Sequence, residues 1–358
     1  MSIIIVFGIL CILLIIILIL NNNKCISQIE IIKNDINDII KRYGVPGSIV
    51  AISSPKEIYI IKQGLANIQK NIPIDIDTIL PIRSITKSFT IYLILMLASE
   101  NILSLDDPIE KYIRGIPNGN IITLRQLANM SSGLSDYIND EFNKNFDVNP
   151  NKIFTLDELN KYITNNLHFS PGTKYEYINA NTNILGAIIE KVTGRTFAEV
   201  LENKILKPFG LNNTKYITNV NDIKNNFVTG YQLNSKHQNN MSIYGPSGSM
   251  VSTISDQLKW GNILVNGNLL SPKYNSERFI ANKFEKGPEY DKYGLGIGEL
   301  NGWWGHTGDG NGVTILTMHN KNKNITVVIF MNISNVKING QKVHLPTKLF
   351  RKISKIYN

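Results

Sequence analysis

The sequence at residues 303–333 is WWGHTGDGNGVTILTMHNKNKNITVVIFMNI. It contains two apolar, β-branched runs, Val313–His319 and Ile325–Ile333, and the polar residues 320–324 separate them. Two such runs joined by a short polar link are typical of a β-hairpin. This stretch therefore predicts two antiparallel strands near the C-terminus.

A second hairpin is expected near the N-terminus. Gly47–Ser54 and Ile58–Ala66 have the same β-like composition and lie around a Ser-Pro-Lys-Glu turn. Hairpins from the two ends of a chain can pair with each other in one sheet. We therefore expect a single antiparallel sheet that is built from both chain ends.

Helices are expected before, between and after these hairpins. Apolar residues recur at helical spacing over residues 29–43, and Gly44 with Pro46 ends that helix. The apolar positions of residues 349–356 fit one face of a closing helix. The segments between the hairpins that have a helical pattern are 123–130, 156–165, 183–192 and 197–206.

The predicted fold class is therefore α+β, with helices that flank the antiparallel sheet. A mostly helical lobe is inserted at approximately residues 100–245, and the whole unit spans residues 29–358. We expect a cleft where the sheet region and the lobe meet, because ligand sites usually occupy such clefts.

Residues 3–20 form an uninterrupted apolar stretch. As a helix they would be about 27 Å long, which is close to the hydrocarbon thickness of a bilayer. The segment predicts an uncleaved transmembrane anchor, with residues 21–28 as a linker, and hence a single-pass membrane protein. The alternatives are a cleaved signal peptide, for which residues 21–24 offer no small-residue site, and a buried core helix. The side of the membrane stays open.

The composition excludes several classes of protein. The chain has 358 residues, 43% of them hydrophobic and 18% charged, so it is too apolar to be disordered. Its two cysteines cannot build a disulfide scaffold or a zinc site of ordinary spacing. The net charge is +9, but the lysines are scattered, and we expect no nucleic-acid partner. The oligomeric state is not predicted.

A Ser-x-x-Lys motif occurs at Ser84-Ile85-Thr86-Lys87. On a helix this spacing places the amine one turn from the hydroxyl, so that a lysine can act as the base for a nucleophilic serine. Residues 53–56 and 334–337 have the same pattern, but only Ser84 is followed by a strongly apolar helix. Apolar surroundings lower the pKa of an amine. A helix-capping serine beside a solvated lysine is the structural alternative.

Two further motifs follow in the chain. Tyr177-Ile178-Asn179 lies in a loop before a helix, and its other copy begins at Tyr137. His306-Thr307-Gly308 lies just before the C-terminal hairpin, among glycines that permit close approach of a ligand to the backbone. Each of these is more often structural when it occurs alone. Their joint order after Ser84-x-x-Lys87 is what favours a site.

With these motifs in this order, the chain resembles the serine β-lactamase and penicillin-binding-protein superfamily, and most of all its class C β-lactamase-related branch, which includes DD-peptidases and esterases. The resemblance covers nearly all of residues 30–345. Other stretches that carry it are 121–127, 131–134, 183–190, 192–194, 208–211, 245–250, 252–253 and 293–296.

The resemblance implies a role for each motif residue. Ser84 would form the acyl-enzyme, with Lys87 and Tyr177 sharing the proton transfers. Asn179, Thr307 and Gly308 would bind substrate, and His306 would orient Tyr177 and the leaving group or bind an anionic end. The backbone amides of Ser84 and Asp309 would form the oxyanion hole. Neither a metal nor an organic cofactor is implied.

Three departures from the family pattern bear on the substrate. Ile178 replaces the usual serine of the second motif, His306 replaces lysine in the third, and Asp309 stands where small residues are usual. A mostly neutral histidine anchors a carboxylate poorly. We therefore predict a membrane-anchored serine hydrolase that cleaves an ester or an amide in a small-molecule or peptide substrate, in the manner of a DD-peptidase or an esterase. A true β-lactamase and an inactive scaffold or peptide-binding protein are the alternatives.

Overall fold

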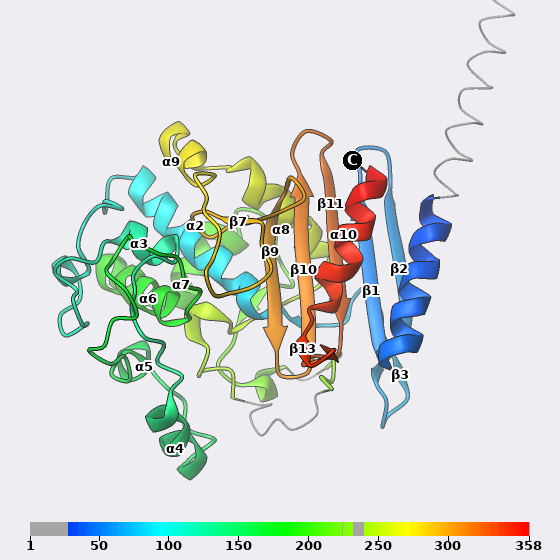
Figure 1. The fold of residues 1–358 in the computed structure, drawn as a ribbon, viewed down its shortest axis with the longest axis horizontal. Coiled ribbons are helices and arrows are strands. Elements are labelled where there is room, and N and C mark those ends of the chain that lie inside the picture. Colours follow the sequence, from blue (N-terminus) through cyan, green and yellow to red (C-terminus); the bar gives the residue numbers. More distant parts are fainter. Residues whose placement is uncertain (1–27, 224, 232–239, 358) are drawn as a thin grey trace, which may run out of the picture.

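The computed structural model describes residues 28–223, 225–231 and 240–357. Its main feature is an antiparallel sheet with the strand order β3-β2-β1-β11-β10-β9-β8-β7, so that the two ends of the chain meet at β1 and β11 (Figure 1). The strands of this sheet are β1 Gly47–Ser53, β2 Ile58–Asn67, β3 Ile72–Pro73, β7 Lys292–Tyr293, β8 Gly298–Leu300, β9 Trp303–Gly310, β10 Val313–Asn320 and β11 Ile325–Met331.

Both predicted hairpins are present, and each strand ends within two residues of the expected position. Successive side chains of a strand point to opposite faces, and this alternation divides the interior into two cores. Ile49 and Ala51 of β1 belong to one core, and Val50 and Ile52 to the other. A sheet that is apolar on both faces requires a helical layer on each side.

One face is covered by a helix at residues 28–43 and by α10 (Leu345–Tyr357), which come from opposite ends of the chain and lie on the same side of the sheet in Figure 1. Ile32 and Ile36 of the first helix and Leu349 and Ile353 of α10 are buried there. Both helices were predicted from their apolar spacing.

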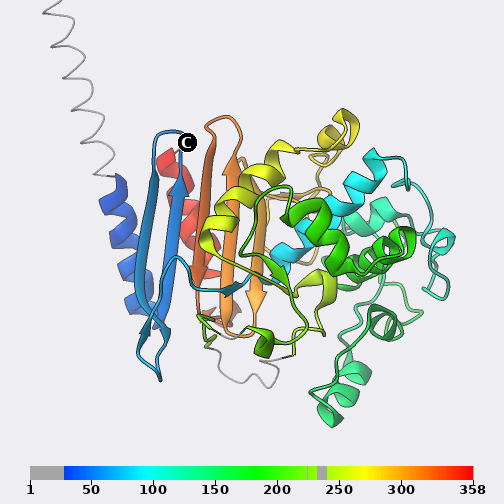
Figure 2. The same ribbon diagram turned by 180° about the vertical axis from the view of Figure 1, so that it is seen from behind.

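The other face is covered by α8 (Ile254–Asn266), and α2 (Thr86–Ser99) packs against α8, with Phe89 stacked on Trp260 (Figure 2). The expected helix at residues 197–206 divides into α7 and a π-turn. The other α-helices are α3 Leu124–Ala128, α4 Asp140–Val148, α5 Leu156–Asn160, α6 Ala180–Thr193, α7 Phe197–Leu201 and α9 Pro272–Glu277. The short 3₁₀ and π turns are η1 Arg83–Ile85, η2 Ile109–Lys111, η3 Glu202–Leu206, η4 Val220–Asp222 and η5 Gly245–Ser247.

Two small sheets complete the fold. One has the order β4-β6-β5 and leads directly into η1; the other is the hairpin of β12 with β13, just before α10. Their strands are β4 Leu80–Pro81, β5 Lys215–Tyr216, β6 Met250–Ser252, β12 Lys337–Ile338 and β13 Gln341–Lys342.

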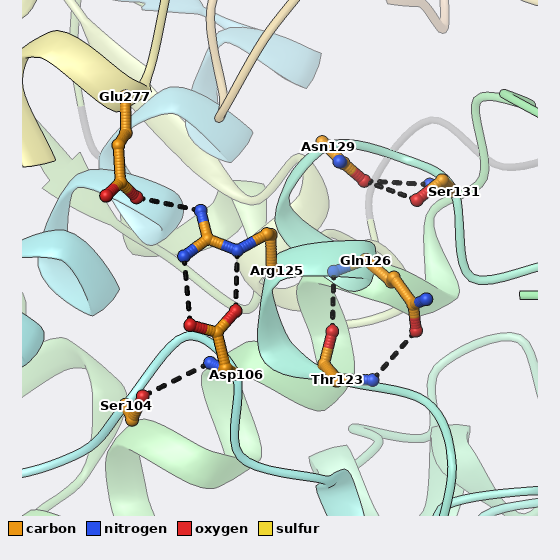
Figure 3. Close-up of polar contacts among 8 residues, drawn as sticks. All are labelled: Ser104, Asp106, Thr123, Arg125, Gln126, Asn129, Ser131 and Glu277. Atoms are coloured by element: carbon orange, nitrogen blue, oxygen red, sulfur yellow. Dashed lines mark hydrogen bonds and ion pairs between the residues drawn. The ribbon is translucent and has the colours of Figure 1, made fainter. Parts of the chain in front are cut away.

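Arg125 of α3 links this helix to the loop at Asp106 and to α9 (Figure 3). Its guanidinium binds Asp106 at 2.7 Å and Glu277 of α9 at 2.8 Å, and these carboxylates hold its pKa above the usual range. Thr123 and Gln126 form a capping box at the start of the same helix. These contacts fix the beginning of the segment that leads from α3 to the candidate site.

The prediction of a transmembrane helix is not supported by the structure. Within residues 28–223, 225–231 and 240–357, the structure contains no helix with the length and apolar character needed to cross a bilayer. The apolar segment 3–20 lies outside the described residues. The α+β part of the predicted fold class stands, whereas the anchor and the single-pass membrane localisation are not supported.

Candidate functional site

A pocket of about 450 Å³ opens where η1, β9 and the segment before α10 meet. Its size is within the range of small-molecule sites. Five of the residues implied by the resemblance line it, namely Ser84, Tyr177, Asn179, Thr307 and Asp309. The other lining residues of the described chain are Gly287, Pro288, Glu289, Tyr290, Leu300, Lys342, His344 and Thr347.

Ser84 lies in η1, between the short strand β4 and the buried helix α2. The sequence predicted that Ser84 begins the helix, but a 3₁₀ turn precedes α2 and holds the serine outside it. Arg83 has a φ of +49°, an unusual value for a residue other than glycine. Such outliers cluster at functional sites because the surrounding structure must impose them.

Gly308 of β9 packs directly behind the serine turn. A Cβ atom at Gly308 would lie 2.3 Å from the carbonyl oxygen of Ile82 and 3.1 Å from Cβ of Arg83. No side chain fits at these distances unless the backbone moves. The third motif therefore places a glycine where the strand must approach η1 closely.

Gly308→Ala is expected to displace η1 and lower kcat by about 10²-fold, because misplacing a reacting group by about 1 Å has an effect of this size. Gly261→Ala is a matched control: its Cβ would lie 2.7 Å from Cγ2 of Thr326, on the α8 side of the sheet. Both variants should unfold at lower temperature, as overpacked cores do. Equal kcat values for the two folded variants would contradict the positioning role of Gly308.

Lys87 is fully buried in the first turn of α2, and its Nζ has three polar neighbours. Nζ lies 3.1 Å from Oγ of Ser84, 2.7 Å from Oδ1 of Asn179 and 2.9 Å from the carbonyl oxygen of Ser247. A neutral amine has two N–H donors and one lone pair. The two carbonyl-type oxygens take the two donors, so the lone pair is left for the hydroxyl proton of Ser84.

The surroundings of Lys87 make this neutral form accessible near pH 7. Burial lowers the pKa of Lys87 to about 7, and the carboxylate of Asp136 opposes the shift. An amine with this pKa can accept a proton near neutral pH and return it later. Lys87 therefore has the position and the pKa of a general base for Ser84.

Asn179 is held in place by Asp136. Oδ2 of Asp136 accepts hydrogen bonds from the backbone N–H of Asn179 at 3.0 Å and from its side-chain Nδ2 at 2.9 Å. Oδ1 accepts from the backbone N–H of Ala180 at 3.1 Å. These contacts leave the amide oxygen of Asn179 facing Lys87. Burial raises the pKa of Asp136, and its backbone N–H donors oppose that rise.

The Tyr177 ring completes the region around Ser84. The amine of Lys87 lies 5.0 Å from the ring centroid, and Phe284 and Tyr293 pack against the ring edge-on. The hydroxyl is shielded from solvent and has no hydrogen-bond partner of ordinary geometry in the described chain. Burial raises the pKa of Tyr177 well above its usual value. A neutral phenol beside the serine is therefore favoured over a phenolate.

His306 is not among the lining residues of the described pocket. Side chains of β9 alternate, so Thr307 and Asp309 face the pocket and His306 faces the opposite side. Its Nδ1 donates to the carbonyl oxygen of Thr307 at 2.7 Å, and its Nε2 accepts from the hydroxyl of Tyr293 at 3.1 Å. Its ring lies 6.2 Å from the ring of Tyr177. The structure therefore places His306 behind Tyr177, not in contact with the cavity.

The expected oxyanion hole includes a backbone N–H of β9, and the direction of that N–H follows from the strand. The N–H of Thr307 points away from β10 and donates to the hydroxyl of Tyr290 at 2.6 Å. Backbone direction alternates along a strand, so the N–H of Asp309 points to the same edge. Ser84 lies in the turn whose Ile82 and Arg83 pack against the face of β9 at Gly308.

Sequence reasoning missed five residues of the site. Asp136 follows the stretch Ser131–Leu134, and its carboxylate gave no motif signal. Glu289 and Tyr290 come from an irregular loop, and Lys342 and His344 from a short hairpin and its exit. Only the fold brings these segments to Ser84, so spacing in the sequence could not reveal them.

Comparison with known proteins agrees with the fold and the motifs. A family model described as Beta-lactamase matches residues 32–339. Protein flp of Staphylococcus aureus (strain MRSA252) is 27% identical over 355 residues, covering 91% of this chain and 67% of that protein. D-aminopeptidase of Brucella anthropi is 28% identical over 233 residues, covering 63% of this chain and 44% of that protein. The chain thus spans about two thirds of the first relative and less than half of the second.

Among solved structures, the D-stereospecific amidohydrolase from Streptomyces sp. is similar over 82% of this chain and 92% of its own, with a TM-score of 0.73 and 27% identity. The family match covers most of the described residues and all three motifs. The resemblance predicted from the motifs is confirmed: the chain belongs to the Beta-lactamase family, within the serine β-lactamase and penicillin-binding-protein superfamily.

Proposed function

We propose that the protein is a serine hydrolase that cleaves amides through an acyl-enzyme on Ser84. The observation that carries this proposal is the environment of Lys87, a buried amine with two acceptors for its protons and Ser84 at the remaining position. Proximity of a nucleophile to a base in this arrangement is the signature of covalent catalysis by serine.

In the proposed first step, Oγ of Ser84 attacks the substrate carbonyl carbon while Lys87 takes the hydroxyl proton. The developing oxyanion is stabilised by the backbone N–H groups of Ser84 and Asp309. The tetrahedral intermediate then collapses: the C–N bond breaks as the phenol of Tyr177 donates a proton to the leaving amine, and Lys87 gives its proton to Tyr177. Asn179 fixes the amine of Lys87 and contacts the amide side of the substrate.

In the second step, water attacks the acyl-enzyme and the same base removes its proton. The C–O bond to Ser84 breaks, the acid leaves, and the serine recovers its proton. Esters would follow the same route, since only the leaving group differs.

For the substrate class, we propose amides of D-amino acids. Two relatives support this: a D-aminopeptidase and a D-stereospecific amidohydrolase, by their names, act on D-configured substrates. The pocket of about 450 Å³ is large enough for one amino acid and a small leaving group. A β-lactam is a weaker candidate, because the lysine that the third motif carries in class C β-lactamases is replaced by the buried His306.

The test is a comparison of D- and L-alanine p-nitroanilide at pH 7, with nitrocefin as a third substrate. The expected result is a preference of about tenfold or more in kcat/KM for the D-enantiomer, the size that one well-shaped pocket provides. Faster hydrolysis of the L-enantiomer would contradict the substrate class. Turnover of nitrocefin alone would favour a β-lactamase.

A further inference from the structure

The charged groups that line the pocket come from three separate segments. Asp309 lies near the end of β9, Lys342 lies on β13, and Glu289 lies in the loop before Tyr290. Nζ of Lys342 is 2.8 Å from Oδ2 of Asp309. The described residues that line the pocket therefore include two carboxylates and one lysine ammonium.

The two histidines of this region add no positive charge. Burial lowers the pKa of His306 to about 3, and it also lowers the pKa of His344. His344 uses both ring nitrogens: Nδ1 accepts from the backbone N–H of Thr347 at 3.2 Å, and Nε2 donates to the carbonyl oxygen of Gly308 at 3.1 Å. Among the lining groups the two carboxylates thus outnumber the one ammonium, while the buried guanidinium of Arg83 also interacts with Asp309 from behind the lining.

The carboxylate of Asp309 already binds a primary ammonium. Its side chain is 26% exposed, whereas that of Lys342 is 52% exposed. Oδ1 of Asp309 is shielded from solvent and has no hydrogen-bond partner in the described chain. A partly exposed ion pair of this kind contributes little to the free energy of folding. The lysine side chain can therefore leave Asp309 for solvent at a small cost in free energy. Asp309, in contrast, is fixed by its place on β9.

We propose that the carboxylate of Asp309 binds the free α-ammonium of the substrate, and that Lys342 occupies this position between turnovers. The proposal rests on the amidase function proposed above. The backbone N–H and the carboxylate of Asp309 are only a few bonds apart, as are the carbonyl oxygen and the α-nitrogen of an amino-acid amide. One residue can thus hold the oxyanion through its backbone and the ammonium through its side chain. Glu289 adds negative charge at the same wall.

The experiment measures one ratio, kcat/KM for D-alanine p-nitroanilide divided by kcat/KM for its N-acetyl derivative, at pH 7. An α-ammonium is mostly charged at this pH, and acetylation removes the charge. The wild-type ratio should be above about 10, and Asp309→Asn should reduce it by about 10- to 100-fold, the strength of a hydrogen bond to a charged group.

Lys342→Met distinguishes a binding role from a structural one. If the substrate ammonium competes with Lys342, this variant should raise the ratio by about two- to fivefold, the strength of a partly exposed pair. If the ion pair only holds the wall in place, Lys342→Met and Asp309→Asn should change the ratio in the same direction. Lys337→Met is the matched control: Lys337 pairs with Lys342 in the β12–β13 hairpin but does not line the pocket, so its ratio should equal that of the wild type.

A wild-type ratio near one, with both substrates hydrolysed, would overturn the ammonium site and leave the amidase function intact. A fall in the ratio for Lys342→Met would also overturn it. Turnover of neither substrate would overturn the proposed function, and the ammonium site with it.

Discussion

Ser84→Ala is expected to lower kcat for a cleaved amide by about 10⁴-fold or more, the scale seen when a catalytic serine is removed. The variant has no hydroxyl to form the acyl-enzyme, and only the oxyanion donors and substrate binding remain. The fold should be unaffected, because η1 is held by its packing on Gly308 and by the hydrogen bond from the N–H of Ile82 to the carbonyl oxygen of Met250. Steady-state kinetics and a thermal melt of the same sample measure both quantities.

The chain offers a matched control for this variant. Ser53 stands in a second Ser-x-x-Lys pattern with Lys56, at the end of β1 and outside the pocket. Ser53→Ala should keep the kcat of the wild type. Equal activity of Ser84→Ala and Ser53→Ala would show that Ser84 is not the nucleophile.

Lys87→Met is expected to lower kcat/KM by about 10³-fold, within the range of general acid–base effects, and to change the pH profile. The pKa of Lys87 is about 7, so below pH 7 the amine is protonated and cannot accept the serine proton. The kcat/KM of the wild type should therefore fall by about tenfold per pH unit below that value. Methionine has a similar length and no proton to exchange, so this acidic limb should disappear.

Profiles of kcat/KM between about pH 5 and pH 9 check this expectation. Lys56→Met is the control, because Lys56 is the exposed lysine of the second Ser-x-x-Lys pattern. It should keep both the rate and the limb. If kcat/KM of Lys87→Met still falls below pH 7 as in the wild type, a group other than Lys87 must cause that fall.

Much of the fold could be predicted from the sequence, because the sheet depends on local patterns. The hairpins at both ends have alternating or continuous apolar runs with polar turns, and these fix strand positions to within two residues. The helix at residues 28–43 and α10 follow from helical spacing in the same way. In the lobe, α5 and α7 begin at the predicted residues 156 and 197, where Thr155 and Thr196 cap them, but they end at Asn160 and Leu201, earlier than predicted.

The site was predictable in part. The motifs predicted Ser84, Lys87, Tyr177 and Asn179 as site residues, and the structure brings all four together. The burial of His306 was not predictable, because the direction of its side chain depends on the register of β9. Asp136 and Lys342 belong to no motif and reach the site only through tertiary contacts. The anchor was predicted from length and hydropathy alone, and no described helix supports it.

The most direct test of the proposed chemistry is mass spectrometry of the protein mixed with excess p-nitrophenyl acetate and quenched with acid within seconds. We expect an acetyl adduct on one peptide, the one that contains Ser84, and no adduct there in Ser84→Ala. An adduct on a different residue, or hydrolysis of the ester with no adduct and no loss in Ser84→Ala, would contradict it.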